Sequence, residues 1–124
     1  MTVARHGIVD APGRPRISLG AAHRGLATVC CTARDRDQGI AGQVRQVLAT
    51  LDGLLAEAGS DKSHLLAAQV WLRDMADYEA LNAVWNDWVD AENPPVRSCL
   101  RADLATPQVL VEIKLTAARK TRRP

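Results

Sequence analysis

The spacing of apolar residues changes several times along the chain and predicts alternating strands and helices. Residues 25–31 form a short, partly β-branched run between a glycine and a charged turn, which is typical of a strand. From Asp37 to Gly59, apolar residues recur at steps of three and four, the spacing of an amphipathic helix. Asp37 is a suitable cap and Gly59 a natural stop, while Gly39 and Gly42 weaken the first turns and allow a later start.

Residues 64–73 are apolar on both alternations of a strand. Leu66, Ala68, Val70 and Leu72 fall on one side, and Leu65, Ala67 and Trp71 on the other. Such a strand belongs inside a sheet that is covered on both faces. A second helix is predicted after Asp74, with an aromatic side formed by Tyr78, Trp85 and Trp88, and Asn93-Pro94-Pro95 ends it.

Two further strands, residues 96–102 and 109–118, close the chain around a turn that contains Pro107. The predicted order is β-α-β-α-β-β. Right-handed crossovers make the first strand pairs parallel, and the last two strands form an antiparallel hairpin. We therefore expect residues 1–124 to form one α/β (α+β) domain, a mixed sheet with two helices on one face.

The two ends of the chain carry weaker patterns. Residues 1–24 are rich in Gly, Pro, Arg and His, and are predicted to be an irregular arm with at most one short strand near residues 16–19. Residues 119–124 form a basic tail, which we expect to be a solvated, frayed terminus.

The predicted architecture leaves one face of the sheet without a cover. Two helices on the same side protect a single face, yet the strand at residues 64–73 is apolar on both. Another copy of the chain is the simplest cover for the second face. The pattern thus predicts an oligomer.

Composition narrows the possible partners. The formal net charge is +2, and the few aromatic residues fall at core positions, so a nucleic-acid surface is not expected. No apolar stretch reaches the roughly 20 residues of a membrane helix, and no leader pattern begins the chain, so a cytoplasmic protein is expected. Cys30, Cys31 and Cys99 form no CxxC pair and no Cys–His ligand spacing, which favours reduced thiols and no metal site.

Candidate chemistry lies on the last two strands. Val109, Val111, Ile113 and Leu115 should face the helices, which turns Glu112 outward, and we expect Arg97 and Cys99 on the same outward face. An arginine fork can bind a carboxylate through two parallel hydrogen bonds, and a nearby glutamate can orient or deprotonate a water. Spacing alone leaves other roles open: Arg97 as a surface residue or partner of an acid such as Asp103, and Cys99 as a small buried residue.

Several segments together resemble the RidA (YjgF) family. Residues 95–100, then Leu104, Pro107 and residues 109–113, are similar to the C-terminal signature of that family. Residues 71–78 through Asn82, Trp85 and Trp88 look like its strand–helix junction in a divergent branch, and residues 43–48 through Ala58-Gly59 match its first helix. The resemblance covers roughly residues 25–118.

The resemblance implies a fold, an assembly and an activity. Members have a chorismate-mutase-like fold, form homotrimers and bind ligands in clefts between subunits. Active members hydrolyse 2-imino or enamine acids such as 2-aminoacrylate to 2-keto acids and ammonia, without a cofactor. Matched by position, Arg97 corresponds to the carboxylate-binding arginine, Cys99 to a pocket cysteine and Glu112 to the glutamate that positions water.

The chain also departs from the family pattern. Many relatives read Ser-Gly-Gln where this chain has Cys30-Cys31-Thr32. Because that glycine lets the backbone approach the ligand, Cys31 is expected to line the pocket and to narrow or reshape it. From the strand pattern, Cys30 and Cys31 are expected to be small strand residues, with Cys31 partly exposed. A pocket tyrosine of the N-terminal loop has no counterpart near residues 16–20. Two alternatives stay open: a non-catalytic trimer that binds a small carboxylic or keto acid, and a chorismate-mutase-type catalyst, for which only Arg97 and Arg101 would supply cations.

Overall fold

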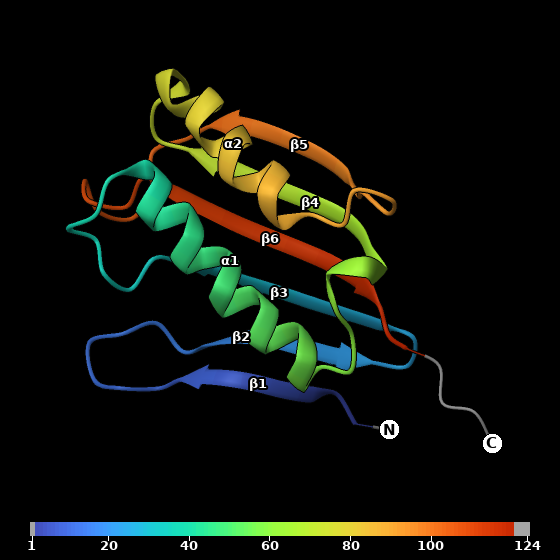
Figure 1. The fold of residues 1–124 in the computed structure, drawn as a ribbon. Coiled ribbons are helices and arrows are strands. Elements are labelled where there is room, and N and C mark those ends of the chain that lie inside the picture. Colours follow the sequence, from blue (N-terminus) through green and yellow to red (C-terminus); the bar gives the residue numbers. More distant parts are fainter. Residues whose placement is uncertain (1, 121–124) are drawn as a thin grey trace.

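The chain forms one six-stranded sheet with two helices packed on the same face (Figure 1). A computed structural model describes residues 2–120. The strands are β1 (Ala4–Val9), β2 (Ile17–His23), β3 (Leu26–Thr32), β4 (Leu65–Leu72), β5 (Val96–Arg101) and β6 (Val111–Ala118). The helices are α1 (Ile40–Glu57) and α2 (Tyr78–Trp88), and short 3₁₀ turns η1 (Lys62–His64) and η2 (Met75–Asp77) precede β4 and α2. The predicted α+β domain with both helices on one face is confirmed.

The order of strands in the sheet is β1-β2-β3-β6-β4-β5. Strands β4 and β5 are parallel, whereas β6 lies antiparallel between β3 and β4. The prediction of a terminal β5–β6 hairpin is therefore wrong. Val111, Ile113 and Leu115 of β6 are completely buried beneath the helices. A central position in the sheet therefore removes the most apolar surface of this strand from water, which stabilises the fold. Strand β5, which is polar at alternate positions, remains at the edge.

The N-terminal arm is not irregular, as the sequence predicted. Strands β1 and β2 form an antiparallel hairpin that extends the sheet beyond β3. The sequence of β1 shows no alternation of apolar and polar residues, because β1 is an edge strand whose side chains are mostly exposed. Gly7 has φ +62°, and a side chain there would approach the Leu19 Cβ to 3.1 Å and the Leu54 Cδ2 to 3.2 Å. Glycine is thus required where α1 crosses the hairpin.

Helix α1 covers the centre of the sheet. Its buried stripe is Gln43, Val44, Val47, Leu48, Leu51, Leu54 and Leu55. The helix begins after Gly39, which has no side-chain cap, so the start is later than Asp37. Gly59 follows the last turn in the left-handed region, at φ +82°, and confirms the predicted stop.

A register shift in β4 changes which leucine reaches the core. The pairing of β4 with β6 is irregular between Leu65 and Ala67. Leu65 is therefore buried with Ala68 and Val70, whereas Leu66 is 49% exposed. Strict alternation had placed Leu66 with the core residues and Leu65 opposite them. An extra residue in one strand reverses the side-chain direction before it, and this cannot be read from the apolar pattern.

A buried amide fixes the loop that leads into β6. The Gln43 Nε2 lies within hydrogen-bond distance of the carbonyl oxygens of Arg36, Gln38 and Gln108, at 3.4, 3.0 and 2.9 Å. Its Oε1 accepts from the Leu110 backbone N–H at 3.0 Å. Gln43 is completely buried, so no water replaces these partners if the amide is removed.

We expect Gln43→Ala to lower the free energy of unfolding by about 2–3 kcal/mol, because it leaves buried backbone groups without partners and opens a small cavity. Gln46→Ala is the matched control: Gln46 bonds Asp35 from a half-buried position one turn away, and its loss should cost less than about 1 kcal/mol. Urea unfolding followed by circular dichroism measures both. Equal losses would show that the Gln43 network contributes nothing specific.

Candidate functional site

Arg97 lies on the edge strand β5, and its side chain reaches helix α2. The parallel register pairs Arg97 with Ala68 and Cys99 with Val70, and both β4 residues are buried on the helix side. The Arg97 Nη2 donates to the Asn82 Oδ1 at 2.7 Å and to the Tyr78 hydroxyl at 3.4 Å. The guanidinium also lies over the rings of Trp85 and Tyr78, at 5.2 and 5.8 Å from their centroids.

The other terminal nitrogen of Arg97 has no acceptor. Nη1 is buried, and residues 2–120 offer it no hydrogen-bond partner. A guanidinium is always charged, and a buried donor without an acceptor is costly. The two aromatic rings and Asn82 therefore hold a cationic fork in place, while one of its nitrogens has no acceptor in the described part of the chain.

Glu112 lies on the opposite face of the sheet. It alternates along β6 with Val111 and Ile113, which are completely buried beneath the helices, so its side chain points away from them. The prediction that Arg97, Cys99 and Glu112 share the face away from the helices is correct for Glu112 and wrong for Arg97 and Cys99. Within one chain the structure does not bring Arg97 and Glu112 together.

The pattern of β5 explains this error. Val96 and Leu100 share one alternation of the strand, and Arg97, Cys99 and Arg101 share the other, so hydrophobicity alone favours an orientation with Arg97 outward. Helix α2 offers Asn82 and two aromatic rings to a guanidinium, and these partners draw Arg97 to the helix side. Val96 and Leu100 are consequently turned outward and are 78% and 55% exposed.

The two cysteines expected to line the pocket lie on the helix side. Cys99 is half-buried and packs against the core, and burial raises the pKa of its thiol while the charge of Arg97 lowers it. Cys31 is only 8% exposed, and its thiol donates to the Val47 carbonyl of α1 at 3.8 Å. Burial, with the charge of Glu112, raises the pKa of Cys31 to about 12. The expectation that Cys31 is partly exposed is therefore wrong.

Cys30 is the cysteine that faces outward. Its thiol donates to the Glu112 Oε2 at 3.5 Å. Burial raises the pKa of Cys30 to about 12, together with the charge of Glu112 and this hydrogen bond. Sequence reasoning assigned no role to Cys30, although alternation from the core residue Val29 would have placed it on the outward face. Asn82 and Tyr78, the partners of Arg97, were also missed, since no local pattern joins α2 to β5.

A small pocket opens on the outward face between β4, β5 and β6. Its volume is about 310 Å³, and its lining consists of Ala67, Ala68, Gln69, Val96, Arg97, Ser98, Lys114 and Thr116. The Ser98 hydroxyl donates to the Gln69 Oε1 at 2.5 Å and joins the two parallel strands across it. The pocket lies between the edge strand and the strand that carries Glu112.

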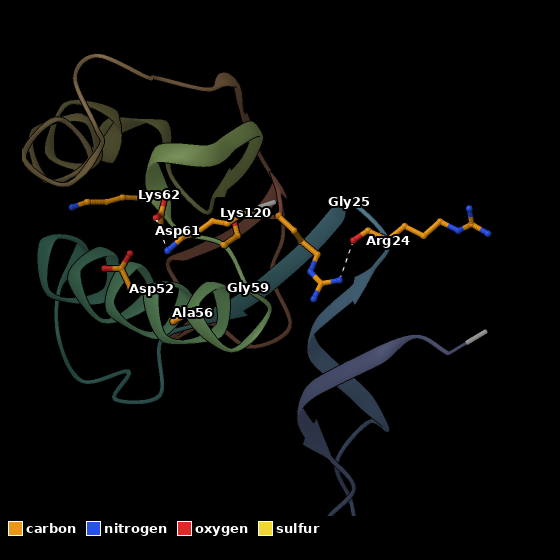
Figure 2. A pocket seen from close by; sticks show the side chains of 10 residues that line it. Arg24, Gly25, Asp52, Ala56, Gly59, Asp61, Lys62 and Lys120 are labelled. Carbon is orange, nitrogen blue, oxygen red and sulfur yellow. Dashed lines mark hydrogen bonds and ion pairs between the residues drawn. The ribbon is translucent and has the colours of Figure 1, made fainter. Parts of the chain in front are cut away.

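A larger hollow of about 1010 Å³ lies where α1 ends (Figure 2). Charged side chains line it, but the contacts that involve them there are largely structural. The Arg119 guanidinium donates to the carbonyls of Ala58 and Arg24, both at 2.9 Å, and Lys120 lies 3.1 Å from Asp61. Arg119 and Lys120 are thus tied to the fold, contrary to the predicted frayed tail; residues 121–124 of that tail lie outside the described residues.

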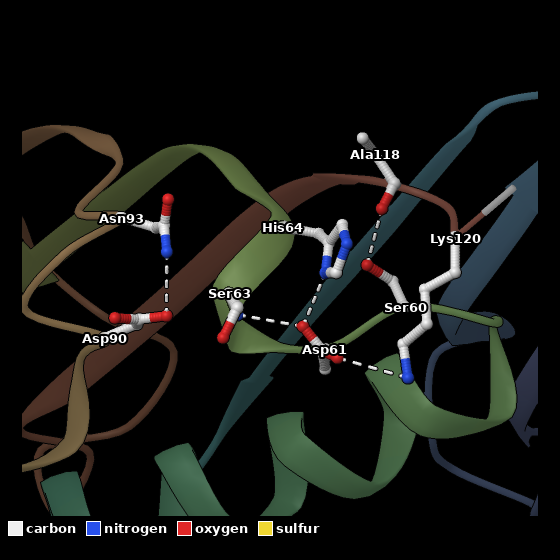
Figure 3. A network of polar contacts seen from close by, with 8 residues as sticks. All are labelled: Ser60, Asp61, Ser63, His64, Asp90, Asn93, Ala118 and Lys120. Atoms are coloured by element: carbon white, nitrogen blue, oxygen red, sulfur yellow. Dashed lines mark hydrogen bonds and ion pairs between the residues drawn. The ribbon is translucent and has the colours of Figure 1, made fainter.

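Asp61 organises the turn beside this hollow (Figure 3). Its carboxylate accepts from the Ser63 backbone N–H at 2.9 Å, contacts the His64 Nδ1 at 2.7 Å and pairs with Lys120. The hydrogen bond with His64 lowers the pKa of Asp61, as do the contacts with Lys120 and Ser63. These bonds are all used to hold the turn, so they suggest no ligand.

Within residues 2–120, no cluster of three or more His, Cys, Asp or Glu residues could hold a metal ion. None of the helices there is long and apolar enough to cross a membrane.

Comparison with known proteins agrees with the fold and the sequence motifs. The family model described as Endoribonuclease L-PSP matches residues 30–119. A solved structure of a YjgF family member from Neisseria meningitidis superimposes with a TM-score of 0.87 at 39% identity and covers 98% of each chain. The observed fold is therefore that of the YjgF proteins, as the resemblance implied.

Sequence relatives support the same family assignment. A RutC family protein from Haemophilus influenzae is 48% identical over 75 residues, which span 60% of this chain and 65% of that protein. The 3-aminoacrylate deaminase RutC of Acinetobacter baylyi is 36% identical over 77 residues, or 62% of this chain and 60% of that protein. The chain thus spans somewhat less than two thirds of the length of these relatives, and the match to the family model covers most of its own. The chain belongs to the Endoribonuclease L-PSP family, which is the RidA/YjgF family of proteins.

Proposed function

We propose that this protein hydrolyses reactive 2-imino and enamine acids, such as 2-aminoacrylate, to 2-keto acids and ammonia. The observation that carries the proposal is the buried Nη1 of Arg97, which has no acceptor within residues 2–120. A substrate carboxylate would supply that acceptor and neutralise the charge. One relative is named a 3-aminoacrylate deaminase, and that substrate is likewise an enamine with a carboxylate.

Arg97 is suited to anchor such an acid. Asn82 and the two rings fix the plane of its guanidinium, so little conformational entropy is lost when a ligand binds. A carboxylate meets the fork through charge-assisted hydrogen bonds, which are stronger than neutral ones. The aromatic walls also exclude water and strengthen the electrostatic attraction.

The site is proposed to form between two chains of a homotrimer. Arg97 and Glu112 lie on opposite faces of one sheet, but β5 is an edge strand whose rim can approach a neighbour. The outward face carries the exposed Val96 and Leu100, which a second chain would cover. A neighbouring chain laid against this edge would present its Glu112 to the ligand held by Arg97.

The reaction needs modest catalysis because the substrate is already electrophilic. An enamine that has taken a proton at carbon is an iminium ion, and a water oriented by Glu112 adds to its C=N carbon. Glu112 accepts the proton that this water loses. Glu112 then returns that proton to the nitrogen of the carbinolamine, the C–N bond breaks to release ammonia, and the hydroxyl group loses its proton to solvent as the C=O bond of the keto acid forms. Orientation by Arg97 contributes by holding the reacting carbon near that water. No cofactor takes part.

We expect Arg97→Ala to lower kcat/KM about 100-fold or more, because loss of a buried charge pair costs roughly 3 kcal/mol. Arg101→Ala is the control: Arg101 lies on the same strand but is exposed, and its variant should keep near-normal rates. Both are measured as keto acid formed from 2-aminoacrylate that a coupled dehydratase supplies. Equal rates for Arg97→Ala and the unaltered protein would remove Arg97 from the site. If the unaltered protein binds pyruvate but forms keto acid no faster than buffer, it is a binding protein without turnover.

Mixing two inactive variants tests the shared site. We expect Arg97→Ala and Glu112→Gln to be inactive separately and to recover activity when refolded together in equal amounts. In random trimers about one interface in four then joins an intact Arg97 to an intact Glu112, since each contributing chain is the required one half the time. Activity near a quarter of the normal value, with a trimeric mass by light scattering, is the expected result. No recovery in mixed trimers would place both residues of a site on one chain.

A further inference from the structure

We propose that Cys30 is a positioning residue for Glu112, and that its thiol donates a hydrogen bond that fixes the orientation of the carboxylate. This inference rests on the proposed function, in which Glu112 orients the attacking water. It assigns a role to the outward-facing cysteine, to which sequence reasoning gave none.

The sheet register brings the two side chains together. Strands β3 and β6 pair antiparallel, with Cys30 opposite Lys114 and Thr32 opposite Glu112. Cys30 and Glu112 are thus diagonal neighbours on the outward face, within reach of one another. The Sγ lies 3.5 Å from the Oε2, an ordinary distance for a thiol that donates to oxygen. Both side chains are half-buried, so water competes only partly for this bond.

The Cys30 thiol is the hydrogen-bonding partner of the Glu112 carboxylate in the described part of the chain. Within residues 2–120, no other hydrogen bond or ion pair involves its carboxylate. The residue paired opposite Glu112 on β4 is Trp71, which carries no charge. One carboxylate oxygen is thereby engaged by Cys30, and the other remains for water.

The thiol acts as a donor and not as a nucleophile. With the pKa of Cys30 at about 12, roughly one molecule in 10⁵ carries a thiolate at neutral pH. A raised pKa keeps the group protonated at every pH below it, so the hydrogen bond persists over the whole working range. Attack on the imine by this sulfur, or its ready oxidation, is disfavoured for the same reason.

Substitution of Cys30 tests the role in turnover. Cys30→Ala should lower kcat about 3- to 10-fold with little change in KM, because Arg97 still binds the carboxylate and only the orientation of Glu112 is lost. Cys30→Ser, which restores a donor, should recover most of the rate. Thr28→Ala is the matched control, since Thr28 lies two residues away on β3 and bonds the Leu115 carbonyl instead. Normal kcat in Cys30→Ala, or failure of serine to restore it, would overturn the role.

Titration of the thiol tests the pair without any substrate. In a Cys31→Ala/Cys99→Ala background, the pH dependence of the rate of alkylation by iodoacetamide reports the pKa of Cys30 alone, because the thiolate is the reacting form. Adding Glu112→Gln removes the neighbouring charge and should lower the pKa of Cys30 by about one unit or more, whereas the exposed Glu79→Gln should leave it unchanged. An unchanged titration in Glu112→Gln would overturn the pair. Absence of turnover in the unaltered protein would overturn the proposed function and the catalytic role of Cys30, whereas the titration would still decide whether the pair exists.

Discussion

The structure depends on a sheet that its own helices can cover on one side only. Helices α1 and α2 bury the alternating core residues of β3, β4 and β6, and the same alternation turns Cys30, Glu112 and Lys114 outward. The direction of each of these side chains follows from the helix layer, because a strand cannot bury one set of residues without exposing the next. The outward face therefore carries polar side chains at its centre and the exposed apolar residues Val96 and Leu100 at its edge.

The position of Arg97 is set by a second constraint. A guanidinium on an edge strand could point to either face of the sheet. Contacts with Asn82, Tyr78 and Trp85 of helix α2 hold the Arg97 side chain on the helix side. These contacts hold the cation without neutralising it, and a buried nitrogen remains without an acceptor. A charge held in this way binds an anion at low entropic cost, and this connects the packing of α2 to the proposed recognition of a carboxylate.

The same geometry separates the binding and water-orienting groups. One chain places Arg97 among the aromatic residues of α2 and Glu112 on the outward face beside Cys30. Assembly would then be part of the proposed chemistry, since each chain would contribute half of two different sites. Such an arrangement would limit the proposed hydrolysis to the assembled protein.

Most elements could be predicted from the sequence alone. The strands at β3, β4, β5 and β6, both helices and the stop at Gly59 follow from local periodicity and backbone preference, which neighbouring residues carry. The outward direction of Glu112 was also predictable, because β6 alternates cleanly between apolar and polar residues.

Only the tertiary structure decided the rest. The insertion of β6 between β3 and β4, the irregular register at Leu65 and the hairpin of β1 and β2 depend on pairing between distant segments, which leaves little local signal. The face of Arg97 was likewise decided by α2, whose Asn82 and Trp85 hold the guanidinium, although the apolar pattern of β5 alone would turn Val96 and Leu100 inward. Specific partners from a distant segment can thus override the local pattern in setting the direction of a side chain.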